Sequence, residues 1–184
     1  MKSNFANRLI NGKLSDHYGI DFGVPQGTVL KAPLGGKIIK RTVQKNGAGL
    51  YVTIRHQVDV GVHIYILLMH LHSVESYINV GYDIAEGEKI GTTGGATGDQ
   101  PNAGCSTGPH LHLEVRRGGN SSANAVEPKY YFLAKERVVA IKTGKILIYG
   151  DPTWLSFDET SLKTQTAYKY SAHSDITVPD ATEY

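Results

Sequence analysis

The residues of this chain that could do chemistry gather first in residues 108–115, which read Gly-Pro-His-Leu-His-Leu-Glu-Val. Polar and apolar side chains alternate here with the two-residue period of a β-strand. The apolar residues therefore share a face that can pack into a core, and the opposite face carries His110, His112 and Glu114. Two neutral imidazoles at this spacing favour a metal ion, a proton-transfer role, or one of each. Taken alone, the segment fits a histidine-rich surface strand without a function equally well.

Two further segments carry groups of the same kind. A short strand is predicted in which His17 and Asp21 share one face. The mostly apolar residues 62–72 predict a central strand, which carries His70 and His72. A zinc enzyme typically holds its ion with three His or carboxylate ligands, keeps one position open for water, and needs a base for the proton of that water. Three histidine-bearing strands side by side, about 4.8 Å apart, would bring such groups together.

The rest of the sequence predicts a β-rich fold around these groups. The 21 glycines and 11 tyrosines indicate many turns and half-buried strands. Strands bounded by Gly, Pro or polar residues are predicted at 27–33, 36–40, 50–56 and 62–72, with short strands over 81–93. Residues 91–109 predict an extended loop, and loops of this length are more often functional than decorative. Residues 1–16 are polar and are predicted to be a loop, and no segment has a long helical period.

Composition excludes several classes of protein. The 184 residues suit one domain that can bury a core. The formal net charge is +2 and no basic run is interleaved with aromatic residues, so nucleic acid is not an expected partner. Cys105 is the one cysteine, which excludes an internal disulfide. No phosphate-binding glycine motif occurs, no segment approaches membrane-spanning length, and residues 1–8 lack the apolar stretch of a secretory signal.

Three motifs in a fixed order resemble the lysostaphin/LytM family of zinc metalloendopeptidases: His17-x-x-x-Asp21, His70-Leu71, and residues 108–114. The resemblance covers roughly residues 15–133. It implies a mainly β fold, a small antiparallel β-sheet or sandwich domain of the duplicated-hybrid-motif type with an open groove. It also implies Zn²⁺ as cofactor and hydrolysis of peptide bonds in the bridges or stems of bacterial peptidoglycan.

The same resemblance assigns roles to single residues. It implies that His17, Asp21 and His112 bind the zinc ion, and that His70 and His110 are the catalytic histidines beside the water that attacks. Strand periodicity alone leaves open which of His110 and His112 is the ligand, so this division comes from the family.

Loops are expected to form the walls of the groove, and one position departs from the family. The expected walls are residues 44–49, 57–63 and 94–109, where glycines allow an extended peptide to approach the backbone. Some relatives have an oxyanion-stabilising tyrosine about six residues before the first ligand, where this sequence has Asn11. Another group, or the zinc ion itself, is then expected to do this work.

Two other kinds of protein compete with the zinc endopeptidase. One is a non-catalytic relative that binds the wall or a partner protein; retention of all three ligands argues against it. The other is a Cys/His peptidase that uses Cys105 with His110. Structural or surface roles are expected for the remaining histidines, which are His56, His63, His72 and His173. Glu114 either orients a ligand histidine or is a simple surface carboxylate.

The sequence also predicts a domain organisation. Residues 1–133 are expected to form the zinc endopeptidase domain, and residues 134–184 a C-terminal β-hairpin, turning at Thr143-Gly144, followed by a polar tail. The expected partners are bacterial peptidoglycan peptides, and the expected location is extracellular, at the bacterial cell wall. A phage lysin or virion tail component, with phage tail proteins contacting the C-terminal extension, fits a sequence without a leader; a fragment of a secreted autolysin fits as well.

Overall fold

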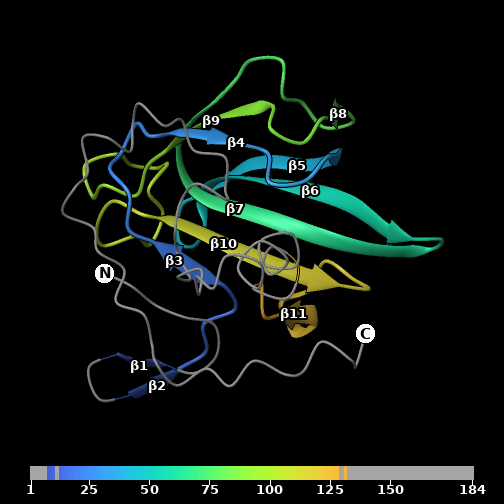
Figure 1. Ribbon diagram of the computed structural model, residues 1–184. Helices are drawn as coiled ribbons and strands as arrows, with labels where there is room; N and C mark the ends of the chain where they lie inside the picture. The colour runs from blue at the N-terminus through green and yellow to red at the C-terminus, as the bar shows by residue number, and fades with distance from the viewer. Residues whose placement is uncertain (1–7, 11–12, 129–130, 132–184) are drawn as a thin grey trace, which may run out of the picture.

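The computed structural model describes residues 8–10, 13–128 and 131, and their regular structure is almost all β-strand (Figure 1). Every strand pairing in this part of the chain is antiparallel. The strands are β1 (Arg8–Ile10), β2 (Lys13–Ser15), β3 (Ile20–Phe22), β4 (Val29–Lys31), β5 (Gly36–Gln44), β6 (Gly49–Asp59), β7 (Val62–Val74), β8 (Asp83–Ile84), β9 (Lys89–Thr93), β10 (Leu111–Arg117) and β11 (Ala125–Val126). The one helix whose bounds lie within the described residues is a 3-10 turn, Ser122–Asn124, and no helix in this part of the chain is long and apolar enough to cross a membrane.

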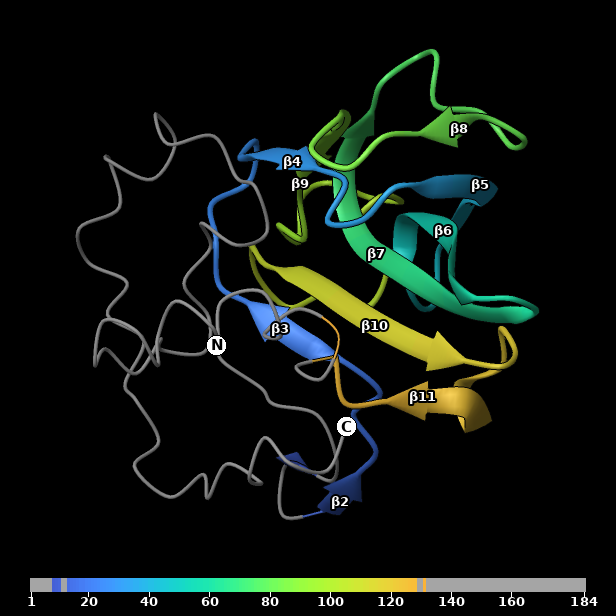
Figure 2. The same ribbon diagram turned by 45° about the vertical axis from the view of Figure 1, so that its right-hand side comes forward.

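One sheet of nine strands carries the histidine-bearing segments. Its central path runs β11-β10-β7-β6-β5-β8, and β4 and β9 form a ribbon that pairs with β7. Strand β10 lies between β7 on one edge and, on its other edge, β3 and then β11 (Figure 2). The three strands β3, β10 and β7 are therefore side by side, as the sequence predicts.

The apolar faces of these strands form the main core. In β10 the side chains of Leu111, Leu113 and Val115 are fully buried, and Leu68 of β7 lies opposite Leu113. Strands β5, β6, β7 and β9 contribute to the same cluster, which also includes Ile38, Val52, Ile54, Ile64, Ile66, Leu71 and Ile90. Burial of this apolar surface is the main stabilising contribution and fixes the register of β10 against β7.

The opposite face of the sheet is organised differently. In the register of β10 with β7, His112 lies opposite Met69 and Glu114 lies opposite Leu67. Met69 and Leu67 pack with Tyr51 and Ala48 in a second, smaller buried cluster. The face with the histidines is thus continuous with an apolar patch on β6 and β7.

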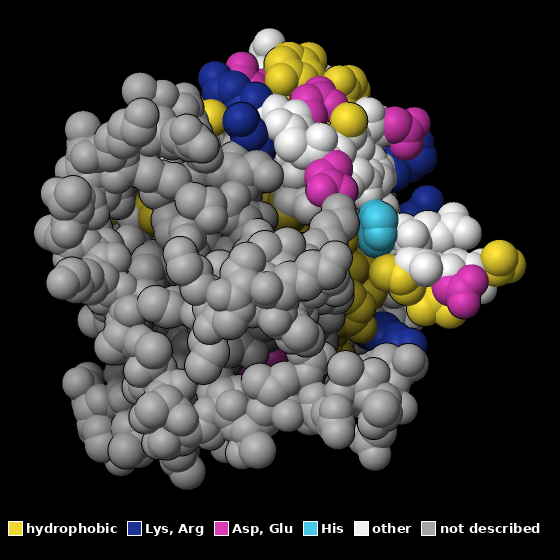
Figure 3. Space-filling model, in the orientation of Figure 1, with side chains coloured by type: hydrophobic (Ala, Val, Ile, Leu, Met, Phe, Trp, Pro, Cys, Tyr) yellow, Lys and Arg dark blue, Asp and Glu magenta, His cyan; other side chains and the backbone are white. Residues whose placement is uncertain are grey.

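The surface has no single sign of charge in the view of Figure 3, where Lys and Arg alternate with Asp and Glu over the upper described part of the molecule. Exposed ion pairs such as Lys37–Asp83 and Lys89–Glu75 contribute to this mixture. This agrees with the small net charge of the sequence.

Most of the predicted strands are confirmed. The segments predicted at 36–40, 50–56 and 62–72 are strands, and each extends beyond the predicted bounds. The predicted loop of residues 91–109 begins later, at Gly94, because β9 runs to Thr93. The predicted C-terminal hairpin and polar tail lie outside the described residues.

Two predictions about the fold are wrong. Residues 1–16 are not simply a loop, because β1 and β2 form a two-stranded antiparallel sheet there. Residues 57–63 do not form a groove wall, because β6 and β7 continue through most of this range. Val62 begins β7 and lies eight residues before His70, at about 3.3 Å per residue, so the β6–β7 turn is roughly 26 Å from that histidine.

Candidate metal centre

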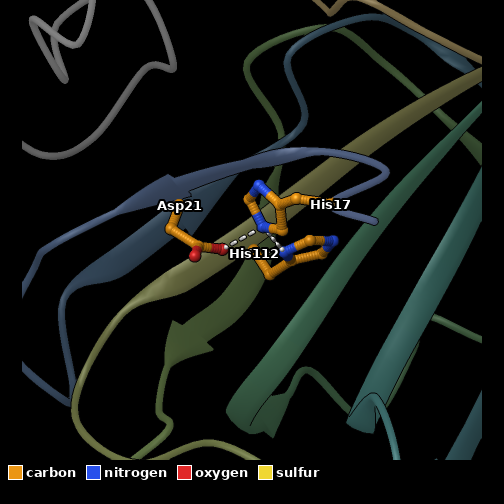
Figure 4. Close-up of side chains that lie close together, drawn as sticks. All are labelled: His17, Asp21 and His112. Carbon is orange, nitrogen blue, oxygen red and sulfur yellow. Dashed lines mark hydrogen bonds and ion pairs between the residues drawn. The ribbon is translucent and has the colours of Figure 1, made fainter. Parts of the chain in front are cut away.

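His17, Asp21 and His112 converge on one point of the structure (Figure 4). Nε2 of His17 lies 3.1 Å from Oδ1 of Asp21 and 3.2 Å from Nδ1 of His112, and the last two atoms are 2.7 Å apart. All three side chains are buried. In the described part of the chain this is the one group of three or more His, Cys, Asp or Glu side chains whose ligand atoms come so close together.

The local sequence explains how His17 reaches the cluster. His17 precedes β3, so it is not a strand residue as predicted, while Asp21 lies in β3 opposite His112 in the pairing with β10. Gly19 stands between the two ligands, and a Cβ there would lie 2.2 Å from the Leu113 carbonyl oxygen and 2.9 Å from Nε2 of His112. Only glycine lets the chain pass so close to β10.

His70 adopts an unusual backbone conformation near this cluster. Its φ angle is +58°, the one positive φ among the described residues other than glycine. Its backbone N–H leaves the sheet ladder and donates to the Ala48 carbonyl at 2.8 Å. Such a strained conformation persists only where the surrounding structure holds it, and it is typical of functional sites.

Backbone carbonyls orient both His70 and His110. Nδ1 of His70 lies 2.9 Å from the Ala103 carbonyl oxygen, and Nδ1 of His110 lies 2.8 Å from the Gly108 carbonyl oxygen. A carbonyl oxygen only accepts, so each Nδ1 carries the hydrogen and each Nε2 is left with its lone pair. The two rings are 4.8 Å apart, and Nε2 of His110 is 3.8 Å from Oδ1 of Asp21.

The protein environment keeps the side chains of His70 and His110 neutral. Burial, together with the neighbouring rings of His110 and His112, lowers the pKa of His70 to about 4. Burial also lowers the pKa of His110, against the opposing effect of its bond to Gly108. Both imidazoles are therefore proton acceptors near neutral pH.

In the cluster of His17, Asp21 and His112, by contrast, the environment favours the charged forms of Asp21 and His112. Burial opposes the charge on Asp21, but hydrogen bonds with His112 and His17 outweigh it and hold the carboxyl pKa well below its usual range. Burial likewise opposes a charge on His112, while hydrogen bonds with Asp21 and Glu114 raise its pKa to about 9. Without a cation, the protein thus favours a proton at this point, which is how a site that attracts positive charge behaves.

The residues present fit a zinc ion. Two imidazole nitrogens and one carboxylate oxygen are among the ligands that zinc uses in catalytic sites, with a fourth position left for water. A tetrahedral ion with bonds of about 2.0–2.1 Å separates its ligand atoms by about 3.3 Å. The two sides of the observed triangle that meet at His17, 3.1 and 3.2 Å, are close to this value, and the Asp21–His112 side is shorter.

The remaining histidines and the cysteine lie apart from this centre. Nδ1 of His56 binds the Gly35 carbonyl oxygen, and His72 is half exposed and pairs with Asp99 at 2.7 Å. His63 lines a separate surface depression, and His173 lies outside the described residues. Cys105 is exposed, and the residues of this loop that contact Nδ1 of His110 are Ser106 and Gly108.

Sequence reasoning missed two residues that support the site. Ser106 is buried, and its hydroxyl lies within 2.8 Å of the carbonyl oxygens of Gly95 and Gly108, which shapes the loop before His110. No strand or helix period marks it in the sequence. Arg116 contacts Glu114, and it could have been found by extending the two-residue period of β10 by one step.

Comparison with known proteins defines the class. Residues 15–126 match the sequence profile of Peptidase family M23, which is more than half of the chain, and the protein therefore belongs to this family. Members of this family are zinc-dependent metallopeptidases, which agrees with the fit of the clustered residues to a zinc ion.

Individual relatives agree with this membership. The chain is 38% identical over 112 residues to an uncharacterized metalloprotease of Haemophilus influenzae, covering 61% of this chain and 21% of that protein. It is 32% identical over 117 residues to the peptidoglycan DD-endopeptidase ShyC of Vibrio cholerae, covering 62% of this chain and 24% of ShyC. The chain thus spans about a fifth to a quarter of these curated relatives.

A solved structure confirms the mainly β, open-sheet fold. The catalytic domain of the antimicrobial peptidase lysostaphin from Staphylococcus simulans superimposes with a TM-score of 0.57 at 30% sequence identity. The superposition covers 71% of this chain and 90% of that domain.

Proposed function

We propose that this protein is a zinc-dependent endopeptidase that hydrolyses peptide bonds in the cross-links or stems of bacterial peptidoglycan. His17 Nε2, Asp21 Oδ1 and His112 Nδ1 hold the ion, and His70 and His110 are the catalytic histidines. The observation that carries the proposal is the convergence of three buried ligand atoms from distant parts of the chain beside two imidazoles that are neutral at pH 7.

Each group then has a chemical task. When bound, a zinc ion polarises a substrate carbonyl and makes water acidic enough to lose a proton near neutral pH. His110 or His70 accepts that proton at Nε2, because Nδ1 of each ring is engaged by a backbone carbonyl. The protonated histidine then donates a hydrogen bond to the oxygen on which negative charge develops, and later gives its proton to the leaving amine.

The substrate class is supported by the relatives. ShyC is named a peptidoglycan DD-endopeptidase, and lysostaphin is named an antimicrobial peptidase. We propose that this chain acts on the same polymer outside the cell, at the bacterial wall.

Zinc content and wall hydrolysis test the proposal together. The full chain is expected to bind one zinc ion and to release soluble fragments from purified peptidoglycan. His17→Ala, or a chelator, is expected to abolish both, and added Zn²⁺ restores the chelated protein only. The matched control is His63→Ala, a histidine outside the site that should leave both measurements unchanged. Hydrolysis that survives both the chelator and His17→Ala would overturn the proposal.

The same experiment separates the alternatives. A non-catalytic relative would sediment with purified walls but release no fragments at full zinc occupancy. A cysteine peptidase would lose activity in Cys105→Ser, whereas the zinc enzyme keeps it, in accord with the exposure of Cys105 and with the contacts of His110 Nδ1, which are to Ser106 and Gly108. Mass analysis of the released fragments then identifies the bond that is cut.

For the biological setting we propose a phage lysin or virion tail component that opens the wall, with residues after the family match contacting phage tail proteins. The support is that residues 127–184 fall outside the match to the peptidase family, which leaves this segment for a different task. Deletion of residues 150–184 is expected to preserve wall hydrolysis and abolish association with phage particles. Retention of particle binding in the shortened protein would contradict this setting.

A further inference from the structure

Glu114 is a buried carboxylate that the catalytic scheme does not use. Its side chain is 6% exposed, and buried acidic residues are rare unless they are paired. It lies on the same face of β10 as His112, two residues further along the strand. Burial of a charged group costs free energy unless the group is paired and hydrogen-bonded, so the partners of Glu114 decide its role.

The two oxygens of Glu114 face different partners. Oε1 lies 3.2 Å from Nε2 of His112. Oε2 accepts from Arg116, at 2.8 Å from Nε and 2.7 Å from Nη2. Arg116 is anchored in turn, because its Nη1 donates to the Asn120 carbonyl oxygen at 2.6 Å. A continuous chain of polar contacts therefore runs from the metal centre to the turn after β10.

This arrangement determines which hydrogen His112 keeps when its other nitrogen binds a cation. An ionised carboxylate only accepts, so Nε2 of His112 is the donor toward Glu114. Nδ1 lies 2.7 Å from Oδ1 of Asp21, so by the same reasoning the zinc-free ring carries a hydrogen on both nitrogens. A zinc ion at Nδ1 would replace that hydrogen and leave the ring neutral, with its hydrogen on Nε2.

We propose that Glu114 is a positioning residue for the metal centre: it holds His112 in the Nε2–H tautomer, so that Nδ1 can bind zinc, and Arg116 holds Glu114 in place. The inference rests on the proposed function, because it takes Nδ1 of His112 as a zinc ligand. Carboxylates that accept from the second nitrogen of a ligand histidine fix its orientation and raise its basicity, and their loss typically costs about 10- to 100-fold in metal affinity or activity.

Glu114→Gln separates this role from simple space filling. The amide has nearly the shape of the carboxylate but one accepting oxygen, and the cationic Arg116 attracts that oxygen. The amide N–H groups then face Nε2 of His112 and favour the tautomer with the hydrogen on Nδ1, which cannot bind zinc there. We expect zinc affinity, measured by competition with a chromogenic chelator on the full chain, to fall by about 10- to 100-fold.

The matched control is Asp83→Asn, which makes the same carboxylate-to-amide change in an exposed pair with Lys37. Its zinc affinity should equal that of the wild type. Nitrogen-15 NMR of the histidine rings in the zinc-free protein at neutral pH gives a second readout, which should show hydrogen on both nitrogens of His112 in the wild type and on Nδ1 alone in Glu114→Gln.

A second substitution sharpens the test further. Arg116→Met in the Glu114→Gln background removes the competitor for the amide oxygen, so that this oxygen can turn to His112. The double variant is therefore expected to regain part of the lost zinc affinity. A role for Glu114 confined to pairing with Arg116 predicts no such rescue and no loss of the hydrogen on Nε2 of His112.

The outcomes distinguish this inference from the function beneath it. Unchanged zinc affinity in Glu114→Gln, with zinc binding lost in His112→Ala, overturns the positioning role and leaves the zinc site standing. Wild-type zinc affinity in His112→Ala overturns the proposed ligand set itself. A lower melting temperature of zinc-free Glu114→Gln with unchanged zinc affinity also counts against the positioning role.

Discussion

The two faces of β10 are both buried, but for different physical reasons. On one face Leu111 and Leu113 are fully buried in the main core, where apolar contacts alone stabilise them. On the other face His112 and Glu114 are buried among charged and polar partners, each at hydrogen-bond distance from the next. One strand thus supplies stability from one side and chemistry from the other.

The difference teaches how the site is held. Apolar burial tolerates small shifts, because it is non-directional. A chain of buried polar groups is favourable only when every member has its partner, and it fixes the position of each one. The core face can therefore set the register of the sheet, while the polar face sets the direction of individual nitrogen and oxygen atoms.

Removal of a catalytic imidazole should give the largest effect confined to the polar face. We expect His110→Ala to lower kcat on purified peptidoglycan by about 10²- to 10⁴-fold, the range for loss of general acid–base catalysis. Zinc should remain at one ion per chain, because His110 is not among the three clustered ligands. If the variant loses zinc together with activity, His110 belongs to the ligand set and the division of roles between His110 and His112 is wrong.

Truncation of a side chain on the core face should lower stability and leave zinc binding and activity unchanged. Leu113 is fully buried opposite Leu68, so Leu113→Ala leaves a cavity and should lower the free energy of unfolding by about 2–5 kcal/mol. Zinc stoichiometry and kcat of the folded protein should be unchanged. Urea denaturation measures the first effect. Val60→Ala, at an 89% exposed position, is the control and should change stability by less than about 0.5 kcal/mol.

The sequence was sufficient to predict the core face. Alternation of apolar residues from 111 to 115 predicts which side chains enter the core, and the structure buries all of them. The longer strands exceed their predicted bounds because pairing continues past the apolar pattern: β5 and β6 pair as far as Gln44 and Gly49. Hydrogen bonding of the backbone extends a strand where the side chains give no signal.

Sequence periodicity predicted less of the candidate metal centre than of the core face. Periodicity placed His112 and Glu114 on one face, but the positive φ of His70 and the close passage at Gly19 depend on contacts between distant segments. The same holds for the carbonyl of Ala103, which orients His70 from a loop 33 residues later. Asn11, where some relatives have a tyrosine, lies outside the described residues. The division between ligand and catalytic histidines stays a prediction from the family resemblance.

The buried neutral imidazole of His70 predicts a pH dependence that the core face lacks. Its pKa falls from 6.5 in the unfolded chain to about 4 in the folded zinc-free protein, so the unfolded chain binds more protons between these values. Stability should therefore decrease as the pH falls from about 6.5 to about 4, by roughly 3 kcal/mol from this residue at 1.36 kcal/mol per pKa unit. Urea denaturation of zinc-free wild type and His70→Gln at several pH values measures the difference. Parallel curves for the two proteins over this window would count against the neutral state of His70.

The smallest expected effect on the free energy of unfolding comes from an ion pair that is exposed to solvent. Lys37 and Asp83 lie 2.7 Å apart, but their side chains are 41% and 77% exposed. Water screens such a pair, so Asp83→Asn should change the free energy of unfolding by less than about 1 kcal/mol, and less still at high salt. Glu114→Gln, the same chemical change in the buried contact with Arg116, should cost more, because Arg116 is then left in the protein without its countercharge. If the two substitutions lower the free energy of unfolding equally, the buried polar contacts of β10 contribute no more to stability than an exposed ion pair. The proposed energetic difference between the two faces of β10 would then be wrong.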